Sequence, residues 1–239
     1  MVGDSITLHV TEIPRGSNII WKFGDEIIAR MNEADRNPST NEGPGAIFKD
    51  RLKLDETGSL TITNIRTEHN GHYSVDIRST NAELKTFQVT VHDEMKIVSV
   101  KEGESVTLRT GAVDIQAFDL ILWEYEDHPM AKIDRTLHQL PKNSVSSRFA
   151  GRLSQNENNG YLTISDSRST DSGDYHLNMN NTAFTLQRTI RVTVKASPQS
   201  GAPSGICGAG VGLVVWVVTA FFAARFVDNR GKGVSVNIK

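Results

Sequence analysis

"SGDYHLN" (residues 172–178) and "NGHYSVD" (residues 70–76) are two versions of one short pattern, and they decide the fold. Further matches precede them in the same order: "GDSITLHV" (3–10) with "GESVTLRT" (103–110), and "GSLTITNI" (58–65) with "GYLTISDS" (160–167). Trp21 lies 52 residues before Tyr73, and Trp123 lies 52 residues before Tyr175. This repetition predicts two tandem domains of one kind, residues 1–93 (the first copy) and residues 94–196 (the second copy).

Each copy consists of short segments in which apolar and polar residues alternate, as in "SLTITNI" and "FQVTVHD". Such alternation places one side of a strand on a core and the other side in water. Turn-rich pieces such as "NPSTNEGPG" and "NENNG" separate these segments, and no amphipathic helix of useful length is present. We therefore predict an all-β chain in which each copy is a sandwich of two sheets.

The motifs and their order resemble the immunoglobulin superfamily. Each copy has a "GxSxTL" strand, a tryptophan 11 or 13 residues past the expected first cysteine, an "SLTI"-type strand and a tyrosine at the corner before the sixth strand. The spacing leaves room for the extra strands of variable-type domains. The resemblance implies a buried core built on Trp21, Trp123, Tyr73 and Tyr175, with each tyrosine hydroxyl bonded to nearby backbone.

Both copies lack the intersheet disulfide that the resemblance would imply. Val10 and Val75 hold the two cysteine positions in the first copy, and Thr110 and Leu177 hold them in the second. Two buried valines compensate in part, because a fully buried apolar side chain contributes about 1.5–3 kcal/mol. Thr110 opposite Leu177 is a poorer pair. We expect the second copy to be the less stable one unless the hydroxyl of Thr110 has a hydrogen-bond partner.

The stretch "FKDRLKLDETGSLTITNIRTEHNGHY" (48–73) is similar to the membrane-distal domain of the signalling lymphocytic activation molecule (SLAM) family, and a related lineage of leukocyte receptors fits it as well. The resemblance implies a protein that binds an immunoglobulin-like receptor or ligand on another cell, or a second copy of itself. The implied contact surface is the sheet of the third, sixth and seventh strands. Alternation and proximity nominate seven residues of the first copy on it: Lys22, Asp25, Glu26, Arg30, His72, Asp76 and Arg78.

Residues 205–224, "GICGAGVGLVVWVVTAFFAA", are twenty residues without a charge, enough for a helix of about 30 Å that spans a bilayer. The segment that follows, 225–239, carries a net charge of +3, which predicts a short cytoplasmic tail and an extracellular N-terminal part. Residues 197–204 read as a stalk. The sequence thus predicts a single-pass type I protein of the plasma membrane. Gly208 and Gly212 have the "GxxxG" spacing that favours a helix dimer.

The sequence contains no fingerprint of an enzyme, a phosphate loop or a metal site. We therefore expect no catalysis, no cofactor, no bound metal and no small-molecule substrate. Residues 1–224 carry a net charge of −5, which argues against a nucleic-acid partner. Asn180 begins the sequon "NNT" and is a candidate N-glycosylation site, since Pro38 disables "NPS".

Two expectations remain open at this point. The first copy begins at "MVGDSITL", directly at its second strand, and no signal peptide is visible, so we expect a longer natural N-terminus. The expected function is cell adhesion or immune recognition through the first copy. The alternative is an adhesion spacer or decoy that has no specific ligand and does not signal.

Overall fold

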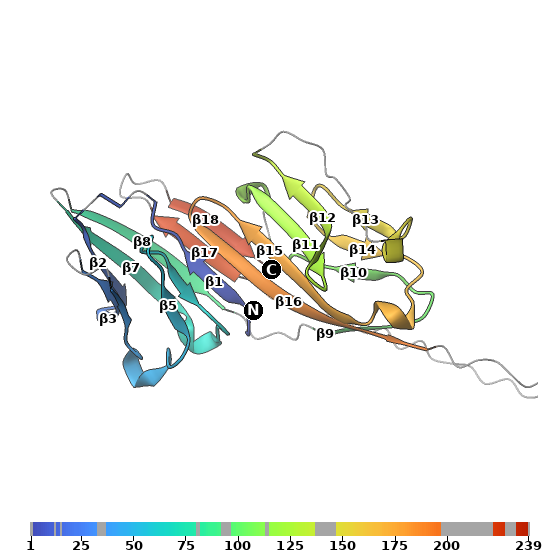
Figure 1. The fold of residues 1–239 in the computed structure, drawn as a ribbon, viewed down its shortest axis with the longest axis horizontal. Helices are drawn as coiled ribbons and strands as arrows, with labels where there is room; N and C mark the ends of the chain where they lie inside the picture. Colours follow the sequence, from blue (N-terminus) through green and yellow to red (C-terminus); the bar gives the residue numbers. More distant parts are fainter. Residues whose placement is uncertain are drawn as a thin grey trace, which may run out of the picture.

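The computed structural model describes residues 2–11, 13–14, 16–32, 37–79, 82–91, 97–112, 115–136, 147–196, 222–227 and 233–238. Strands and short 3-10 turns make up the regular structure of these ranges, and none of these ranges contains an α-helix. The all-β sandwich predicted from the alternation is confirmed, and it is immunoglobulin-like, as the resemblance implies. Figure 1 shows an elongated molecule in which β1 and β16 run side by side near its middle.

The strands of the first copy form two layers. One layer contains β2 (Asn18–Phe23), β3 (Glu26–Met31), β4 (Pro38–Thr40), β7 (Gly71–Arg78) and β8 (Glu83–Thr90), in the order β8-β7-β2-β3-β4; we call it the β7 sheet. The other layer contains β1 (Ser5–Leu8), β6 (Leu60–Ile62) and β5 (Leu52–Leu54). The side chains between the two layers are buried, among them Ile6, Leu60, Trp21 and Val75.

The strands of the second copy repeat this plan. One layer contains β12 (His128–Asp134), β11 (Leu120–Tyr125), β15 (Gly173–Asn180) and β16 (Phe184–Lys195), with β9 (Ile97–Lys101) parallel to the last residues of β16. The opposing layer contains β10 (Val106–Leu108), β14 (Leu162–Ile164) and β13 (Leu153–Gln155).

The two copies are joined edge to edge. β1 pairs antiparallel with β16, with Ser5 opposite Gln187 and Leu8 opposite Phe184. The result is one continuous sheet in the order β12-β11-β15-β16-β1-β6-β5, which we call the shared sheet. Residues directly opposite each other point to the same side of a sheet. The buried residues Ile6 and Leu186 are such a pair, so both cores lie on the same face of the shared sheet, and its other face is turned to solvent.

A buried ion pair fixes this junction. The guanidinium of Arg188 donates from Nε to Asp4 Oδ2 at 3.1 Å and from Nη1 to the carbonyl oxygen of Thr110 at 2.6 Å. The side chains of Asp4 and Arg188 are both fully buried. Removing either partner would leave an uncompensated charge, which is far more costly than losing an exposed pair.

The aromatic core has the same arrangement in both copies. The indoles of Trp21 and Trp123 donate to the carbonyl oxygens of Gly58 and Gly160, each at 2.8 Å. The hydroxyl of Tyr73 donates to the carbonyl oxygen of His69 at 2.8 Å, and that of Tyr175 to the carbonyl oxygen of Asp171 at 2.7 Å. All four aromatic side chains are buried.

The positions of the absent disulfides are buried as well. Val10 and Val75 lie in the core of the first copy, and Leu177 lies in that of the second. The hydroxyl of Thr110 donates to the carbonyl oxygen of Asn159 at 3.0 Å, so this buried polar group has a partner. Since its hydroxyl has a hydrogen-bond partner, Thr110 is not expected to make the second copy the less stable one.

The C-terminal residues in the structure differ from the sequence expectation. Residues 222–224 were expected to end an apolar helix, but β17 (Phe222–Val227) pairs antiparallel with β8, and β18 (Gly233–Ile238) pairs with β17. The alternation of Val234, Val236 and Ile238 is typical of a strand. Residues 197–221, including the stalk, Gly208 and Gly212, lie outside the described residues. Within the described part of the chain, no helix is long and apolar enough to span a bilayer.

Candidate functional site

The seven residues nominated from the sequence lie on or beside the solvent face of the β7 sheet. Strand register arranges its side chains in rows. One row runs from Arg30 through Ile20 and Asp76 to Leu84, and the next runs from Ile27 through Lys22 and Ser74 to Thr86. We use the name β7 face for the side chains of these two rows that are open to solvent, together with those of Asp25, Glu26, His72 and Arg78 at the ends of the sheet.

The structure brings the nominated residues together in two groups. Asp76 and Arg78 form an ion pair, with Arg78 Nε 2.8 Å from Asp76 Oδ2, and Arg30 lies two strands away in the row of Asp76. Asp25 and Glu26 lie at the other end of the face, at the β2–β3 turn, where the amide of Gly24 donates to the carbonyl oxygen of His72. Lys22 lies between the two groups. Figure 1 shows β2, β3 and β7 at the end of the molecule away from the second copy.

Sequence reasoning missed two hydrophobic side chains on this face. Ile27 is 40% exposed and Leu84 is 47% exposed, and only one other large hydrophobic side chain among the described residues, Ile97, is as open to solvent. A register shift between Trp21 and Lys22 turns Ile27 outward. Strict alternation cannot reveal such a bulge. Leu84 could have been found from alternation, because Phe87 and Val89 are the buried residues of β8 and the even-numbered residues therefore point outward.

The corner that precedes the long strand with the buried tyrosine, β7 in the first copy and β15 in the second, differs between the copies. In the second copy, Arg152 donates to both oxygens of the buried Asp171, at 2.7 and 3.0 Å. Burial favours a higher pKa for Asp171, but the hydrogen bonds of Arg152 and of the Arg168 amide outweigh it, and the pKa lies below its ordinary value.

In the first copy, His69 occupies the position of Asp171. Its Nδ1 accepts from the Arg66 amide at 2.9 Å, and its Nε2 lies 2.8 Å from the carbonyl oxygen of Ile47. Nε2 must therefore carry the proton. The ring is fully buried and stacks on Phe48, with centroids 4.9 Å apart. Burial lowers the pKa of His69 below its ordinary value.

No metal or catalytic centre emerges from these contacts. No group of three or more His, Cys, Asp or Glu residues could hold a metal ion in the ranges that the structure describes. Asn180 is the last residue of β15 and is partly exposed, on the solvent face of the shared sheet opposite Thr185.

Comparison with known proteins agrees with this architecture. Residues 93–195 match the family model described as the immunoglobulin V-set domain. The second copy is thus similar to the immunoglobulin V-set domain. The recognition of the immunoglobulin superfamily from the sequence motifs is therefore confirmed.

The chain is also similar to curated proteins of flies. It is 24% identical over 195 residues to "Tyrosine-protein kinase-like otk" of Drosophila yakuba, and 22% identical over 195 residues to the protein of the same name in Drosophila melanogaster. Each match covers 78% of this chain and 18% of the fly protein, so the chain spans less than a fifth of the length of these relatives.

Solved structures that the chain is similar to include CD84 of the SLAM family. CD84 is 24% identical, with a TM-score of 0.37, and the match covers 44% of this chain and 100% of CD84. Murine CEACAM1b is 20% identical, with a TM-score of 0.28, and the match covers 80% of this chain and 92% of that one.

Proposed function

We propose that this chain is a cell-surface recognition protein whose first copy binds a protein on a neighbouring cell through the β7 face. One observation carries the proposal: two of the three large exposed hydrophobic side chains of the described residues, Ile27 and Leu84, lie on this face among charged residues. Apolar anchors within a polar surround are typical of protein contact surfaces.

The chemistry of the face suits a specific contact of modest strength. Leu84 and Ile27 supply apolar area, and burying such side chains contributes about 1.5–3 kcal/mol each. The charges contribute mainly to the choice of partner, because exposed ion pairs such as Asp76–Arg78 are worth about 0–1 kcal/mol. The partner is an immunoglobulin-like protein or a second copy of this chain.

The placement of the chain at the cell surface is part of the proposal. The uncharged run from Gly205 to Ala224 would serve as the single membrane helix, with Gly208 and Gly212 available for dimer contact and Asn180 carrying a glycan. In a bilayer we expect residues 222–224 to leave β17 and complete that helix, because a membrane helix forms all its backbone hydrogen bonds within itself.

The test uses the full chain displayed on cells, with surface amounts equalised by an epitope tag. Cells bearing the chain are mixed with leukocytes and with cells that bear the same chain. We expect adhesion to one of these, and we expect Leu84→Asp to reduce binding at least tenfold. The charge-reversed pair Asp76→Arg and Arg78→Glu should change which partner is bound.

Lys53→Glu is the matched control, since Lys53 is an exposed lysine of β5 on the opposite layer. It should leave adhesion unchanged. If the displayed chain is folded and adheres to neither kind of cell, or if Leu84→Asp adheres as well as the unaltered chain, the recognition proposal is wrong. The chain would then be the spacer or decoy that the sequence leaves as the alternative.

A further inference from the structure

The solvent face of the shared sheet carries a hollow at the junction of the two copies. The hollow has a volume of about 300 Å³, at the lower end of the usual range for small-molecule sites. Gly3 and Ser5 of the first copy form one side of it, and residues of β11, β15 and β16, with Asp127 of the β11–β12 turn, form the rest. It is therefore complete only because β1 pairs with β16.

Strand register places its polar side chains in two adjacent rows. Ser5, Gln187 and Asn178 are consecutive neighbours in one row, and Thr189, His176 and Glu124 are consecutive neighbours in the next. Neighbouring strands are about 4.8 Å apart, and the rows are about 6.8 Å apart. The hollow thus presents a regular array of hydroxyl, amide, imidazole and carboxylate groups.

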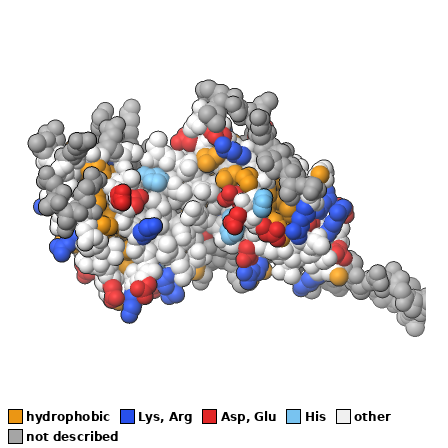
Figure 2. Space-filling model, viewed as in Figure 1, with side chains coloured by type: hydrophobic (Ala, Val, Ile, Leu, Met, Phe, Trp, Pro, Cys, Tyr) orange, Lys and Arg blue, Asp and Glu red, His pale blue; other side chains and the backbone are white. Residues whose placement is uncertain are grey.

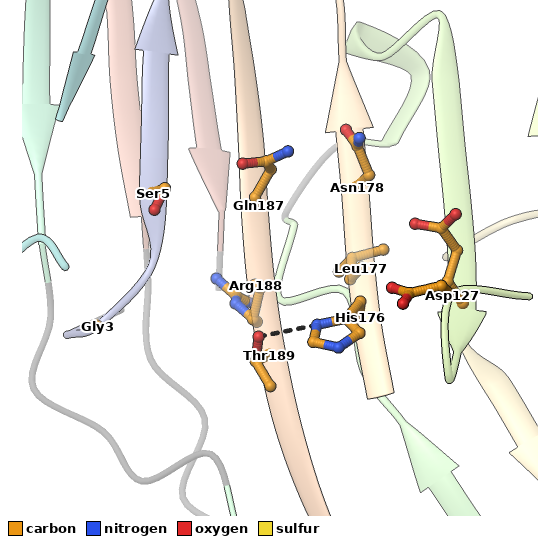
Figure 3. Close-up of a pocket in the computed structure, with 10 residues that line it drawn as sticks. Gly3, Ser5, Asp127, His176, Leu177, Asn178, Gln187, Arg188 and Thr189 are labelled. Atoms are coloured by element: carbon orange, nitrogen blue, oxygen red, sulfur yellow. Dashed lines mark hydrogen bonds between the residues drawn. The ribbon is translucent and has the colours of Figure 1, made fainter. Parts of the chain in front are cut away.

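Some polar groups of this array already have a hydrogen-bond partner within the protein, and others do not. His176 Nδ1 and the hydroxyl of Thr189 are 3.0 Å apart, and Figure 3 shows this contact across β15 and β16. Asn178 Oδ1 is enclosed and has no hydrogen-bond partner in the described part of the chain. A rotation of the Asn178 amide toward the hollow would let a ligand that donates a hydrogen bond satisfy this oxygen.

The charges of the hollow exclude anions. Arg188 is the one Lys or Arg among the lining residues, and its side chain is buried and donates to Asp4 and to the carbonyl oxygen of Thr110. Its Nη2 is enclosed and has no hydrogen-bond partner among the described residues. In Figure 3 its guanidinium turns toward the strand that carries Ser5, away from Asp127. Glu124 and Asp127 also line the hollow. A phosphate, sulfate or sialic acid would meet two carboxylates and one buried guanidinium that is already paired with Asp4.

The surroundings are polar and flat. Thr7 lies opposite Thr185 on one side and Thr61 on the other, and the hydroxyls of Thr7 and Thr61 are 2.9 Å apart. Figure 2 shows this face: charged and hydrophobic side chains lie toward its two ends, and the centre, over β1 and β16, consists of other side chains and backbone. Apolar ligands and apolar helices find little to bury here.

We infer that this junction hollow binds a neutral, hydroxyl-rich ligand, namely an oligosaccharide. Sugar hydroxyls both donate and accept hydrogen bonds, as the lining amides and hydroxyls do. The hollow lies on the shared sheet and not on the β7 sheet, so the inference is independent of the proposed protein contact. The ligand would be bound without chemical change.

The test is saturation-transfer NMR on the full chain with maltotriose, lactose and N-acetylchitotriose, and with 3′-sialyllactose as the anionic match of lactose. The detergent must lack a sugar headgroup. We expect at least one neutral saccharide to bind with a Kd of about 1 mM, as befits a few hydrogen bonds in an open site. Asn178→Ala combined with Gln187→Ala should weaken it at least tenfold.

Ser5→Ala should also weaken binding, because it removes the hydroxyl that the first copy contributes. The matched control Lys53→Ala, on the same sheet but outside the hollow, should not. Urea unfolding of each variant verifies that it is folded. The inference is overturned if no neutral saccharide binds the folded chain up to about 10 mM, if only 3′-sialyllactose binds, or if the folded double variant binds as before.

Discussion

The histidine corner predicts that the first copy loses stability in mild acid while the second copy does not. His69 Nδ1 accepts the Arg66 amide, and its Nε2 proton faces the carbonyl oxygen of Ile47. A second proton would have to enter at Nδ1, where it meets an N–H group. The ring is fully buried, and among the neighbouring charges Arg51 and Arg66 oppose protonation whereas Glu68 favours it. Burial is the largest cause of the lowered pKa.

The sign follows from the protons bound in each state. His69 has an ordinary pKa near 6.5 when the chain is unfolded and a lower one when it is folded, so below pH 6.5 the unfolded state binds more protons. The free energy of unfolding of the first copy therefore falls by up to about 1.4 kcal/mol for each pH unit below 6.5, until the folded-state pKa is reached.

The second copy also loses stability as the pH falls, but only at a lower pH. The pKa of Asp171 is depressed in the folded state, so its contribution is present at neutral pH and is lost only as the pH falls below its ordinary range near 4. Between pH 7.5 and pH 5.5 only the first copy should weaken, by about 1.4 kcal/mol at most from His69.

Hydrogen–deuterium exchange read by mass spectrometry checks this, because peptides from residues 60–78 and 162–180 report on the two copies separately. His69→Gln should reduce the acid effect, since an amide can both donate to Ile47 and accept from Arg66. A smaller effect should remain, because burial also lowers the pKa of His9 in the first copy. His72→Gln, at an exposed histidine of the same strand end, should leave the effect in place. Equal protection of the first copy at both pH values, or an unchanged acid effect in His69→Gln, would refute the reasoning.

Three further substitutions test the junction and the core of the second copy. Arg188→Ala should cost about 3–5 kcal/mol in urea unfolding, because it removes the ion-pair partner of the buried Asp4 carboxylate, whereas leucine at both positions should cost less. Thr110→Val should cost about 1–3 kcal/mol, because the carbonyl oxygen of Asn159 loses its donor, and a loss below about 0.5 kcal/mol would contradict this. Gly160→Ala should lower the melting temperature, since its φ is +70° and the new Cβ would lie 2.9 Å from the Cγ2 of Thr110.

The features predicted from the sequence are those that local spacing determines. Tyr73 and Tyr175 lie at corners whose hydrogen bonds close over four residues, so the motif around each contains the whole arrangement. Alternation places a side chain on a face only while the register is unbroken. The bulge after Trp21 breaks it and turns Ile27 outward, which the sequence alone does not show.

The junction could not be predicted, because it depends on which distant edge β1 meets. The segment "SITL" has the alternation of many edge strands. Nothing in it indicates that it pairs with β16, about 180 residues away. The buried pair of Asp4 and Arg188 follows from that pairing. The hollow depends on it as well, since one of its sides is Gly3 and Ser5.

The length of β16 has a mechanical consequence. Its residues 191–195 are held by β9 and its residues 184–187 by β1, while β15 pairs along most of the other edge. Tension applied at Lys195, where this strand ends, runs along β16 and loads these hydrogen bonds together in shear, because they lie across the strand. We expect the two copies to resist stretching as one stiff element, without extension or bending at a hinge between them.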